Sequence, residues 1–219
     1  MRYVDVSHPI SDGMDAFPGL ERPRITAVMD HEQSRPRYRD AAEFYISKVE
    51  MVGNTGTYLD SPFHRYRDGS ELSEIPLADV AGLPGVVVDG AVGGDRAVSL
   101  DADESQLEGQ AVLVRTGWDD RWGTEAYWEP GPYISRATLE LLVRARPKLV
   151  AVDFWNVDDT QDPSRRVHTR LLAEGILIVE HLRGLGALPR TGFRFFAVPL
   201  AVVTGASLPV RAFAEVPAG

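Results

Sequence analysis

Short runs of apolar and β-branched residues, each bounded by turn-forming residues, recur along the whole chain. Runs of this length are typical of strands, and the glycines and prolines between them favour tight connections. The pattern predicts strands at Arg2–Val6, Ile46–Val52, Gly85–Asp89, Ala111–Arg115, Leu149–Asp153, Ile176–Val179, Phe195–Leu200 and Val210–Val216. The segments 149–153 and 176–179 are almost entirely apolar, which predicts strands that are covered on both faces.

Apolar positions at helical spacing mark two further segments. The first, 135–146, begins with Ser135 as its N-cap. The second, 164–174, stops at Gly175, a residue type that is common directly after a helix. Each helix leads within a few residues into one of the predicted strands. With strands near both ends of the chain, these pairs predict a mixed α/β fold, a single domain over residues 1–219 that is not doubly wound.

Composition narrows the classes of function. Apolar residues make up 44% and charged residues 25% of the 219, which is typical of a globular protein. The absence of cysteine excludes disulfides, thiolate metal sites and a cysteine nucleophile. The net charge of −9 argues against a nucleic-acid partner. No phosphate-binding glycine loop, serine elbow, signal peptide or membrane-spanning stretch is recognisable, so we expect a cytoplasmic protein without a membrane partner.

The densest group of polar residues lies in Asn54-Thr-Gly-Thr-Tyr-Leu-Asp-Ser-Pro-Phe-His64. Pro62 disfavours a helical conformation at the residue before it, so the stretch is expected to be extended. Residues of equal parity share one face of an extended chain. We therefore expect an amide, a phenol, a carboxylate and an imidazole on one face, from Asn54, Tyr58, Asp60 and His64.

A second polar group spans His168 to Glu180. From His168 the predicted helix climbs about 10 Å, and the predicted strand then returns about 13 Å to Glu180. The two side chains are therefore expected at the same level. A buried carboxylate beside a histidine needs a partner or a metal ion. In a simpler alternative, Glu180 pairs with Arg183 or Arg166, and Asp60 belongs to an ordinary turn.

Other candidates carry structural alternatives. His8 can edge a pocket or lie in a loop, whereas His181 is expected to be structural, on the strand face opposite Glu180. An aromatic-rich stretch forms either a packed surface loop or the wall of a pocket or dimer contact for an aromatic substrate. Its members are Trp118, Trp122, Tyr127, Trp128 and Tyr133.

Together these segments resemble the cyclase family of metal-dependent hydrolases, which includes bacterial kynurenine formamidases and isatin hydrolases. The family motif HxGTHxDxPxH corresponds to residues 54–64, and a later His and Glu around an LLxxGI element correspond to His168 and Glu180. Supporting matches cover nearly the whole chain: Val4–Ile10, Phe17–Gly19, Leu113–Trp118 and Val152–Asp153. The resemblance implies a β/β/α domain of the swivelling type, a small-molecule substrate and a homodimer or higher homo-oligomer.

The resemblance also implies roles for individual residues. Asp60, His168 and Glu180 correspond to metal ligands, and His64 to the proton donor and acceptor. The family's two histidines of the first metal site are absent at positions 54 and 58. In their place stand an asparagine and a tyrosine, both weaker ligands than imidazole for a borderline-soft ion.

Three arrangements follow from this difference. The one we favour places one divalent ion, zinc or manganese, on Asp60, His168 and Glu180, with room for water. In the second, a harder ion such as Mn²⁺ uses the oxygens of Asn54 and Asp60. In the third, no catalytic metal is bound, and Tyr58, His64 and the carboxylates carry out acid–base chemistry alone.

The sequence thus predicts a metal-dependent hydrolase of an amide, cyclic amide or lactone in a small, aromatic molecule. The metal would polarise the carbonyl and acidify water, and His64 would carry the proton. Tyr58 or Asn54 would hydrogen-bond the carbonyl oxygen. The alternatives are a metal-free cyclase, dehydratase or isomerase, and a small-molecule-binding relative without catalysis.

Overall fold

A computed structural model describes residues 1–218 of the chain. Its main feature is a curled mixed sheet of eleven strands within these residues, with the order β1-β13-β11-β5-β7-β9-β10-β4-β12 and with β6 and β8 attached beside β5. The strands are β1 (Arg2–Asp5), β4 (Tyr58–Asp60), β5 (Ala81–Val92), β6 (Ala97–Leu100), β7 (Ala111–Arg115), β8 (Tyr133–Ile134), β9 (Leu149–Val152), β10 (Leu177–Glu180), β11 (Phe193–Phe196), β12 (Ser207–Pro209) and β13 (Phe213–Val216).

The centre of the sheet is parallel and buried on both faces. β5, β7, β9 and β10 are parallel neighbours, and β7, β9 and β10 are almost wholly buried. Val112, Val150 and Ile178 belong to a core cluster that includes Leu142 and Leu171 of the helices. Alternate residues of the same strands join a second cluster with Phe193, Phe195 and other C-terminal residues. This two-sided burial explains the continuous apolar runs of these strands.

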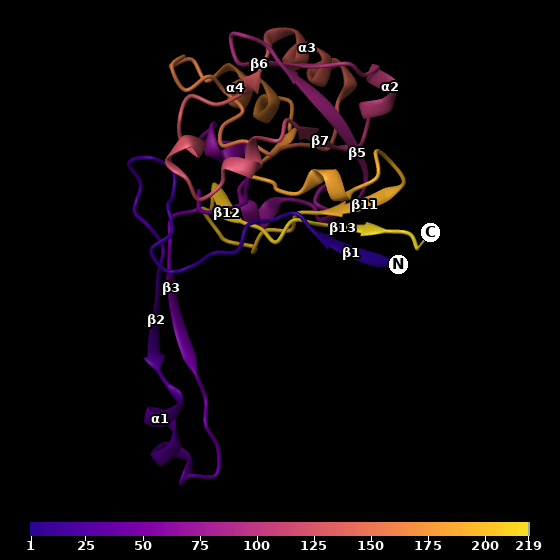
Figure 1. Ribbon diagram of the computed structural model, residues 1–219. Coiled ribbons are helices and arrows are strands. Elements are labelled where there is room, and N and C mark those ends of the chain that lie inside the picture. Colours follow the sequence, from indigo (N-terminus) through magenta and orange to yellow (C-terminus); the bar gives the residue numbers. More distant parts are fainter. Residues whose placement is uncertain (219) are drawn as a thin grey trace.

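Helices cover one face of the sheet. They are α2 (Glu104–Leu107), α3 (Arg136–Ala145) and α4 (Arg166–Ala173), which lie together in Figure 1. Ser135 caps α3 by accepting the backbone N–H of Thr138 at 3.1 Å, as predicted. α4 begins two residues later than its predicted start at 164. None of the helices among residues 1–218 is both long and apolar enough to cross a bilayer.

A two-stranded arm extends away from the body of the molecule. β2 (Arg24–Met29) pairs antiparallel with β3 (Ile46–Glu50), and α1 (His31–Ser34) lies at the far end (Figure 1). Most side chains of both strands are exposed, among them Val28 and Val49. The hydrophobic pattern predicts β3 but not β2.

Two predicted strands near the C-terminus have different bounds. The segment 195–200 is predicted as one strand, but β11 ends at Phe196, after a register shift against β5. Pro199 follows and has no N–H to donate to a ladder. The predicted strand 210–216 begins only at Phe213, and residues 207–209 form the separate β12. The mixed α/β fold itself is confirmed, and it is antiparallel at its margins: β1 pairs with β13.

Candidate metal centre and active site

β4 brings the two polar segments of the chain together. It lies between β10 and β12 and is antiparallel to both. In this register Tyr58 stands opposite Glu180, and Asp60 stands opposite Ile178 and Ser207. Directly after β4, a turn of 3₁₀ helix at Pro62–His64 swings the imidazole of His64 back toward Asp60.

His168 lies in the first turn of α4 and faces two buried carboxylates. Its Nε2 is 3.6 Å from Oδ2 of Asp60 and 3.7 Å from Oε1 of Glu180. Both carboxylates are completely buried, and Oδ2 of Asp60 has no hydrogen-bond partner within residues 1–218. The predicted placement of His168 level with Glu180 is confirmed.

Asp158 orients His168 and caps the N-terminal end of α4. Oδ2 of Asp158 lies 2.7 Å from Nδ1 of His168 and also accepts the backbone N–H of His168 at 3.1 Å. Oδ1 of Asp158 accepts the backbone N–H of Val167 at 2.6 Å. The carboxylate thus satisfies the first N–H groups of the helix, which explains why α4 begins at Arg166. Because Nδ1 faces this carboxylate, the proton of the neutral ring belongs on Nδ1, and Nε2 keeps its lone pair for the site.

Glu180 is held by partners on both oxygens. Oε1 accepts the backbone N–H of Val157 at 2.7 Å, and Oε2 accepts the phenolic hydroxyl of Tyr58. The alternative pairing with Arg183 or Arg166 is therefore wrong, since Arg166 pairs with Asp162 instead. Tyr58 is itself completely buried, and Asn54 lies next to it in the pocket lining.

His64 is connected to Asp60 through a serine. Nδ1 of His64 lies 3.0 Å from the hydroxyl of Ser207, and that hydroxyl donates its proton to Oδ1 of Asp60. The hydroxyl has a single proton, so it accepts from Nδ1–H of His64. The basic nitrogen of His64 is then Nε2. At 34% side-chain exposure, His64 is more accessible than the fully buried Asp60.

The electrostatics follow from burial and close charges. Burial raises the pKa of Asp60, but the approach of His168 Nε2 to 3.6 Å and the charges of both histidines outweigh burial and lower it overall. Burial lowers the pKa of His168, yet the hydrogen bond to Asp158 and the nearby carboxylates of Asp60 and Glu180 raise it to about 10. Burial also raises the pKa of Glu180 to about 7 and that of Tyr58 well above its usual range. The cluster therefore attracts a cation: a proton on Nε2 of His168 or a metal ion in its place.

The donor set fits a divalent ion. One ligand atom each from Asp60, His64 and His168 lies within 4.8 Å of the others. The unpartnered Oδ2 of Asp60 is an unused acceptor that a cation would satisfy. Nitrogen and oxygen donors of this kind suit zinc or manganese. The three residues with closely spaced ligand atoms include His64, whereas the ligand set predicted from the sequence has Glu180 instead of His64. Oε1 of Glu180 lies 3.7 Å from Nε2 of His168.

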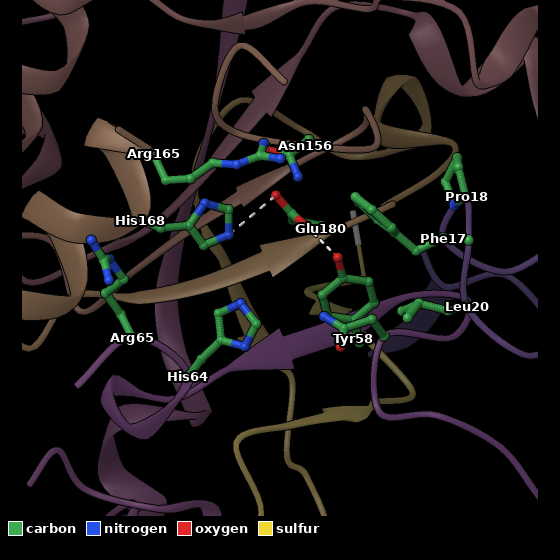
Figure 2. A pocket seen from close by; sticks show the side chains of 12 residues that line it. Phe17, Pro18, Leu20, Tyr58, His64, Arg65, Asn156, Arg165, His168 and Glu180 are labelled. Carbon is green, nitrogen blue, oxygen red and sulfur yellow. Dashed lines mark hydrogen bonds and ion pairs between the residues drawn. The ribbon is translucent and has the colours of Figure 1, made fainter. Parts of the chain in front are cut away.

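A pocket of about 320 Å³ opens over the cluster. Figure 2 shows His64 and His168 on one side and the short apolar segment Phe17–Leu20 on the other, with Glu180 and Tyr58 between them. Asn54, Arg65, Asn156 and Arg165 complete the lining. All the predicted site residues therefore converge: five line the pocket, and Oδ1 of Asp60 lies 3.7 Å from Nδ1 of His64. Asn54 and His64 reach it through turns rather than through one continuous extended strand.

The aromatic-rich stretch packs behind this pocket rather than lining it. Tyr127 is buried and hydrogen-bonds Nδ1 of His181 at 2.8 Å, so His181 has the expected structural setting. Trp122 stacks on His8, with ring centroids 3.7 Å apart. His8 and Ser7 edge a different depression. The apolar wall of the pocket is instead the segment Phe17–Leu20, of which only Phe17–Gly19 was noted in the sequence, as part of the resemblance.

Four residues near the site were not anticipated. Asp158 lies five residues beyond the predicted strand 149–153, and nothing in its spacing marks it as the partner of His168. Ser207, Arg65 and Arg165 lie in loops or at element ends, where spacing says little about which side chains meet. Only the tertiary structure brings them to His64 and His168.

Comparison with known proteins agrees with this fold. Residues 4–159 match the family described as putative cyclase. A kynurenine formamidase of Salinibacter ruber is 28% identical, with 97% of this chain and 96% of that protein covered, and one of Bacillus cytotoxicus is 26% identical, with 96% and 95% covered.

Solved structures share the architecture. Isatin hydrolase A of Labrenzia aggregata superposes with a TM-score of 0.80 at 24% identity, covering 98% of this chain and 93% of the other. A structure described as a potential metal-dependent hydrolase with cyclase activity gives 0.76 at 22% identity, with 99% of both chains covered. The chain belongs to the cyclase family, as the sequence motifs indicated.

Proposed function

We propose that this protein is a metal-dependent hydrolase that cleaves an amide bond in a small aromatic molecule, as a kynurenine formamidase does. The observation that carries the proposal is the convergence of Asp60, His168 and Glu180 at the base of a pocket. The names of the relatives matched over nearly the whole chain support the same chemistry.

Asp60, His168 and Glu180 would hold one zinc or manganese ion. All three side chains are at least nine-tenths buried and are fixed by hydrogen bonds, as ligands must be to keep their geometry. A divalent cation there supplies Lewis-acid polarisation of the amide carbonyl and acidifies water. The unpartnered Oδ2 of Asp60 favours a bound cation over acid–base chemistry without metal.

His64 would carry the proton to the leaving nitrogen. Its Nδ1 is engaged by Ser207, so the basic Nε2 is the atom left to take up a proton and to release it. Because His64 also lies within the compact donor set, it is the residue whose role needs a direct test. Loss of turnover with metal retained in a His64→Gln variant assigns proton transfer, whereas equal loss of metal would assign His64 as a ligand.

Asn54 would stabilise the carbonyl oxygen as negative charge develops on it. Tyr58 uses its single hydroxyl proton on Glu180, so the amide of Asn54 is the better placed donor of the two. Tyr58 would instead keep Glu180 in position.

An assay on aryl formamides tests the proposed function. We expect release of formate and the arylamine by the protein purified without chelator, and loss of this activity in an Asp60→Asn variant. Aryl formamides left intact by protein that retains its metal would contradict the proposal.

We also propose that the chain acts as one domain in a homodimer formed through the β2–β3 arm. A two-stranded ribbon is marginally stable alone, and this arm exposes Val28, Phe44, Tyr45 and Val49. A second copy of the chain would cover them. The cytoplasmic location expected from the sequence remains a prediction, which cell fractionation tests.

A further inference from the structure

The residue directly after Glu180 has an uncommon backbone conformation. β10 ends at Glu180, and His181 follows with a φ of 61°, in the left-handed region. A residue with a β-carbon adopts this conformation at a cost, although histidine is among the residue types in which it is more frequent. Contacts with the surrounding structure must therefore hold His181 in place. Because His181 shares a peptide bond with Glu180, those contacts also affect where the Glu180 carboxylate lies.

Hydrogen bonds fix the backbone of His181 on both sides. Its N–H donates to the carbonyl oxygen of Phe154 at 3.2 Å, and its own carbonyl oxygen accepts the hydroxyl of Thr57. Thr57 directly precedes Tyr58, and its hydroxyl also accepts the backbone N–H of His8 at 3.0 Å. The chain after β10 is thus tied to the start of β4 and to the N-terminal segment at one point.

The imidazole of His181 lies in a cage of four aromatic rings. Its Nδ1 is 2.8 Å from the hydroxyl of Tyr127, and both side chains are buried. The rings of Tyr58, Trp122 and Trp128 complete the cage, with centroids 5.3, 5.6 and 5.8 Å from that of His181. Tyr127 packs edge to face against both tryptophans, at 4.9 and 5.2 Å. Three residues of the aromatic-rich stretch therefore enclose a single histidine.

Packing alone does not account for this arrangement. An apolar ring would fill the same cage, but only a ring with a nitrogen can bond to the buried hydroxyl of Tyr127, which needs a partner. Tyr58 links the cage to the site. Its ring lies against His181, while its hydroxyl donates to Oε2 of Glu180 (Figure 2). The caged histidine is therefore connected to Glu180 both through the chain and through Tyr58.

Building on the proposed metal site, we propose that Tyr127 and His181 are a pair of positioning residues: their hydrogen bond holds the chain after β10 in the left-handed conformation and so fixes the carboxylate of Glu180 for the metal ion. Neither residue lines the pocket, so both act through Glu180. Without this bond the backbone at His181 relaxes, and Oε1 of Glu180 moves away from the N–H of Val157, which it accepts at 2.7 Å. A ligand that is held less firmly binds the metal more weakly.

The zinc affinity of variants of the pair tests the proposal. Tyr127→Phe removes the hydroxyl, and His181→Asn tolerates the left-handed backbone but lacks the ring that reaches Tyr127. We expect each variant to bind zinc about 10-fold more weakly in competition with a chromophoric chelator. The double variant should bind zinc as weakly as His181→Asn alone, because the hydroxyl then has no ring to hold. Unchanged affinity in Tyr127→Phe, or losses that multiply in the double variant, overturns the proposal.

A matched control separates positioning from a general loss of stability. Thr138→Val also removes a buried hydroxyl, one that donates to the carbonyl oxygen of Val98 in β6 at 2.9 Å. We expect this variant to unfold at a lower denaturant concentration and yet to bind zinc as tightly as the wild type. An equal loss of zinc affinity in Thr138→Val would reduce the effect of Tyr127→Phe to stability and overturn the proposal.

Crystal structures separate this proposal from the metal chemistry on which it rests. If the wild type binds no divalent ion, the proposed function fails, and the structures of the wild type and Tyr127→Phe then test the positioning alone. A changed φ at His181, together with loss of the hydrogen bond from Val157 to Glu180, supports the proposal. A Glu180 carboxylate that superposes on its wild-type position overturns it.

Discussion

The hydroxyl of Tyr58 donates its hydrogen bond to Oε2 of Glu180, across two antiparallel strands in which the two residues are direct partners. Both side chains are completely buried, and the other oxygen of Glu180 accepts the N–H of Val157 at 2.7 Å. A tyrosine therefore satisfies a carboxylate that would otherwise be buried with an open lone pair.

Replacement of Tyr58 by Phe removes this donor and leaves Oε2 of Glu180 without a partner. We expect the free energy of unfolding to fall by about 1–3 kcal/mol, because a buried acceptor loses its hydrogen bond. Denaturant titration measures the change. Tyr133→Phe is the control, since Tyr133 is only half-buried and does not donate to Glu180. Equal stability of both variants would show that the Tyr58 bond contributes nothing.

The double replacement Asn54→His and Tyr58→His restores the histidines of the family motif. It supplies two imidazoles and frees Oε2 of Glu180, so we expect bound zinc to rise from about one to about two ions per chain. Metal analysis after equilibration with zinc and desalting gives the count. A count that stays at the wild-type value would mean that positions 54 and 58 do not set the stoichiometry.

Asp158→Asn tests how His168 is oriented. The amide can no longer accept from Nδ1–H and both backbone N–H groups as a carboxylate does, so we expect metal affinity to fall about 10–100-fold. Competition with a chromophoric chelator measures this. Asp162→Asn, just before the same helix, is the matched control, because Asp162 accepts the N–H of Ser164 without contacting His168. Comparable losses in both variants would reduce the effect to a general weakening of the helix start.

His8 makes the stability depend on pH. Burial first, and then the charge of Arg183, lowers its pKa to about 3, against 6.5 for the free side chain. Between pH 3 and pH 6.5, His8 is therefore protonated in the unfolded chain but neutral in the folded protein. Because the unfolded chain binds this proton, stability is lost as the pH falls below 6.5. At pH 4.5 this loss amounts to about 2–3 kcal/mol.

His8→Phe tests this pH dependence. Phenylalanine can still stack on Trp122, and Nε2 of His8 has no hydrogen-bond partner within residues 1–218 to lose. We expect the free energy of unfolding of His8→Phe to fall less between pH 7 and pH 4.5 than that of the wild type. Denaturant titration at each pH measures this difference. The same slope in both proteins would exclude His8 as its source.

If the β2–β3 arm forms the dimer interface, polar substitutions on it should convert the dimer into a monomer. Val28→Ser with Val49→Ser makes two exposed positions of the β2–β3 ribbon polar, at 62% and 49% exposure. The variant should elute as a monomer with unchanged far-UV circular dichroism, because neither side chain packs in the body. Leu77→Ser, at a similarly exposed position outside the arm, is the control. Light scattering that finds a dimer in the variant would assign the interface elsewhere.

Local periodicity was enough to predict part of the site. The α4–β10 pair has a fixed rise per residue, so the sequence alone could place His168 and Glu180 at one level. The parity of positions 58 and 60 likewise put Tyr58 and Asp60 on one face of β4.

The sequence could not predict which loops meet. Ser207 reaches Asp60 only because β12 pairs with β4, and a three-residue strand that contains a proline has no clear periodic signal. The β2 strand was missed because most of its residues are exposed, so no hydrophobic face marks it. The hydrogen bond between Tyr58 and Glu180 depends on the register of β4 against β10. This register cannot be predicted from the sequence of either strand alone.

The central claim is that Asp60 and His168 together hold a cation, and metal analysis of protein purified without chelator tests it most directly. We expect about one zinc or manganese ion per chain in the wild type and near-complete loss in Asp60→Asn, with the fold retained by circular dichroism. Wild-type protein that retains no divalent metal after equilibration with either ion, or Asp60→Asn that retains as much as the wild type, would contradict the account.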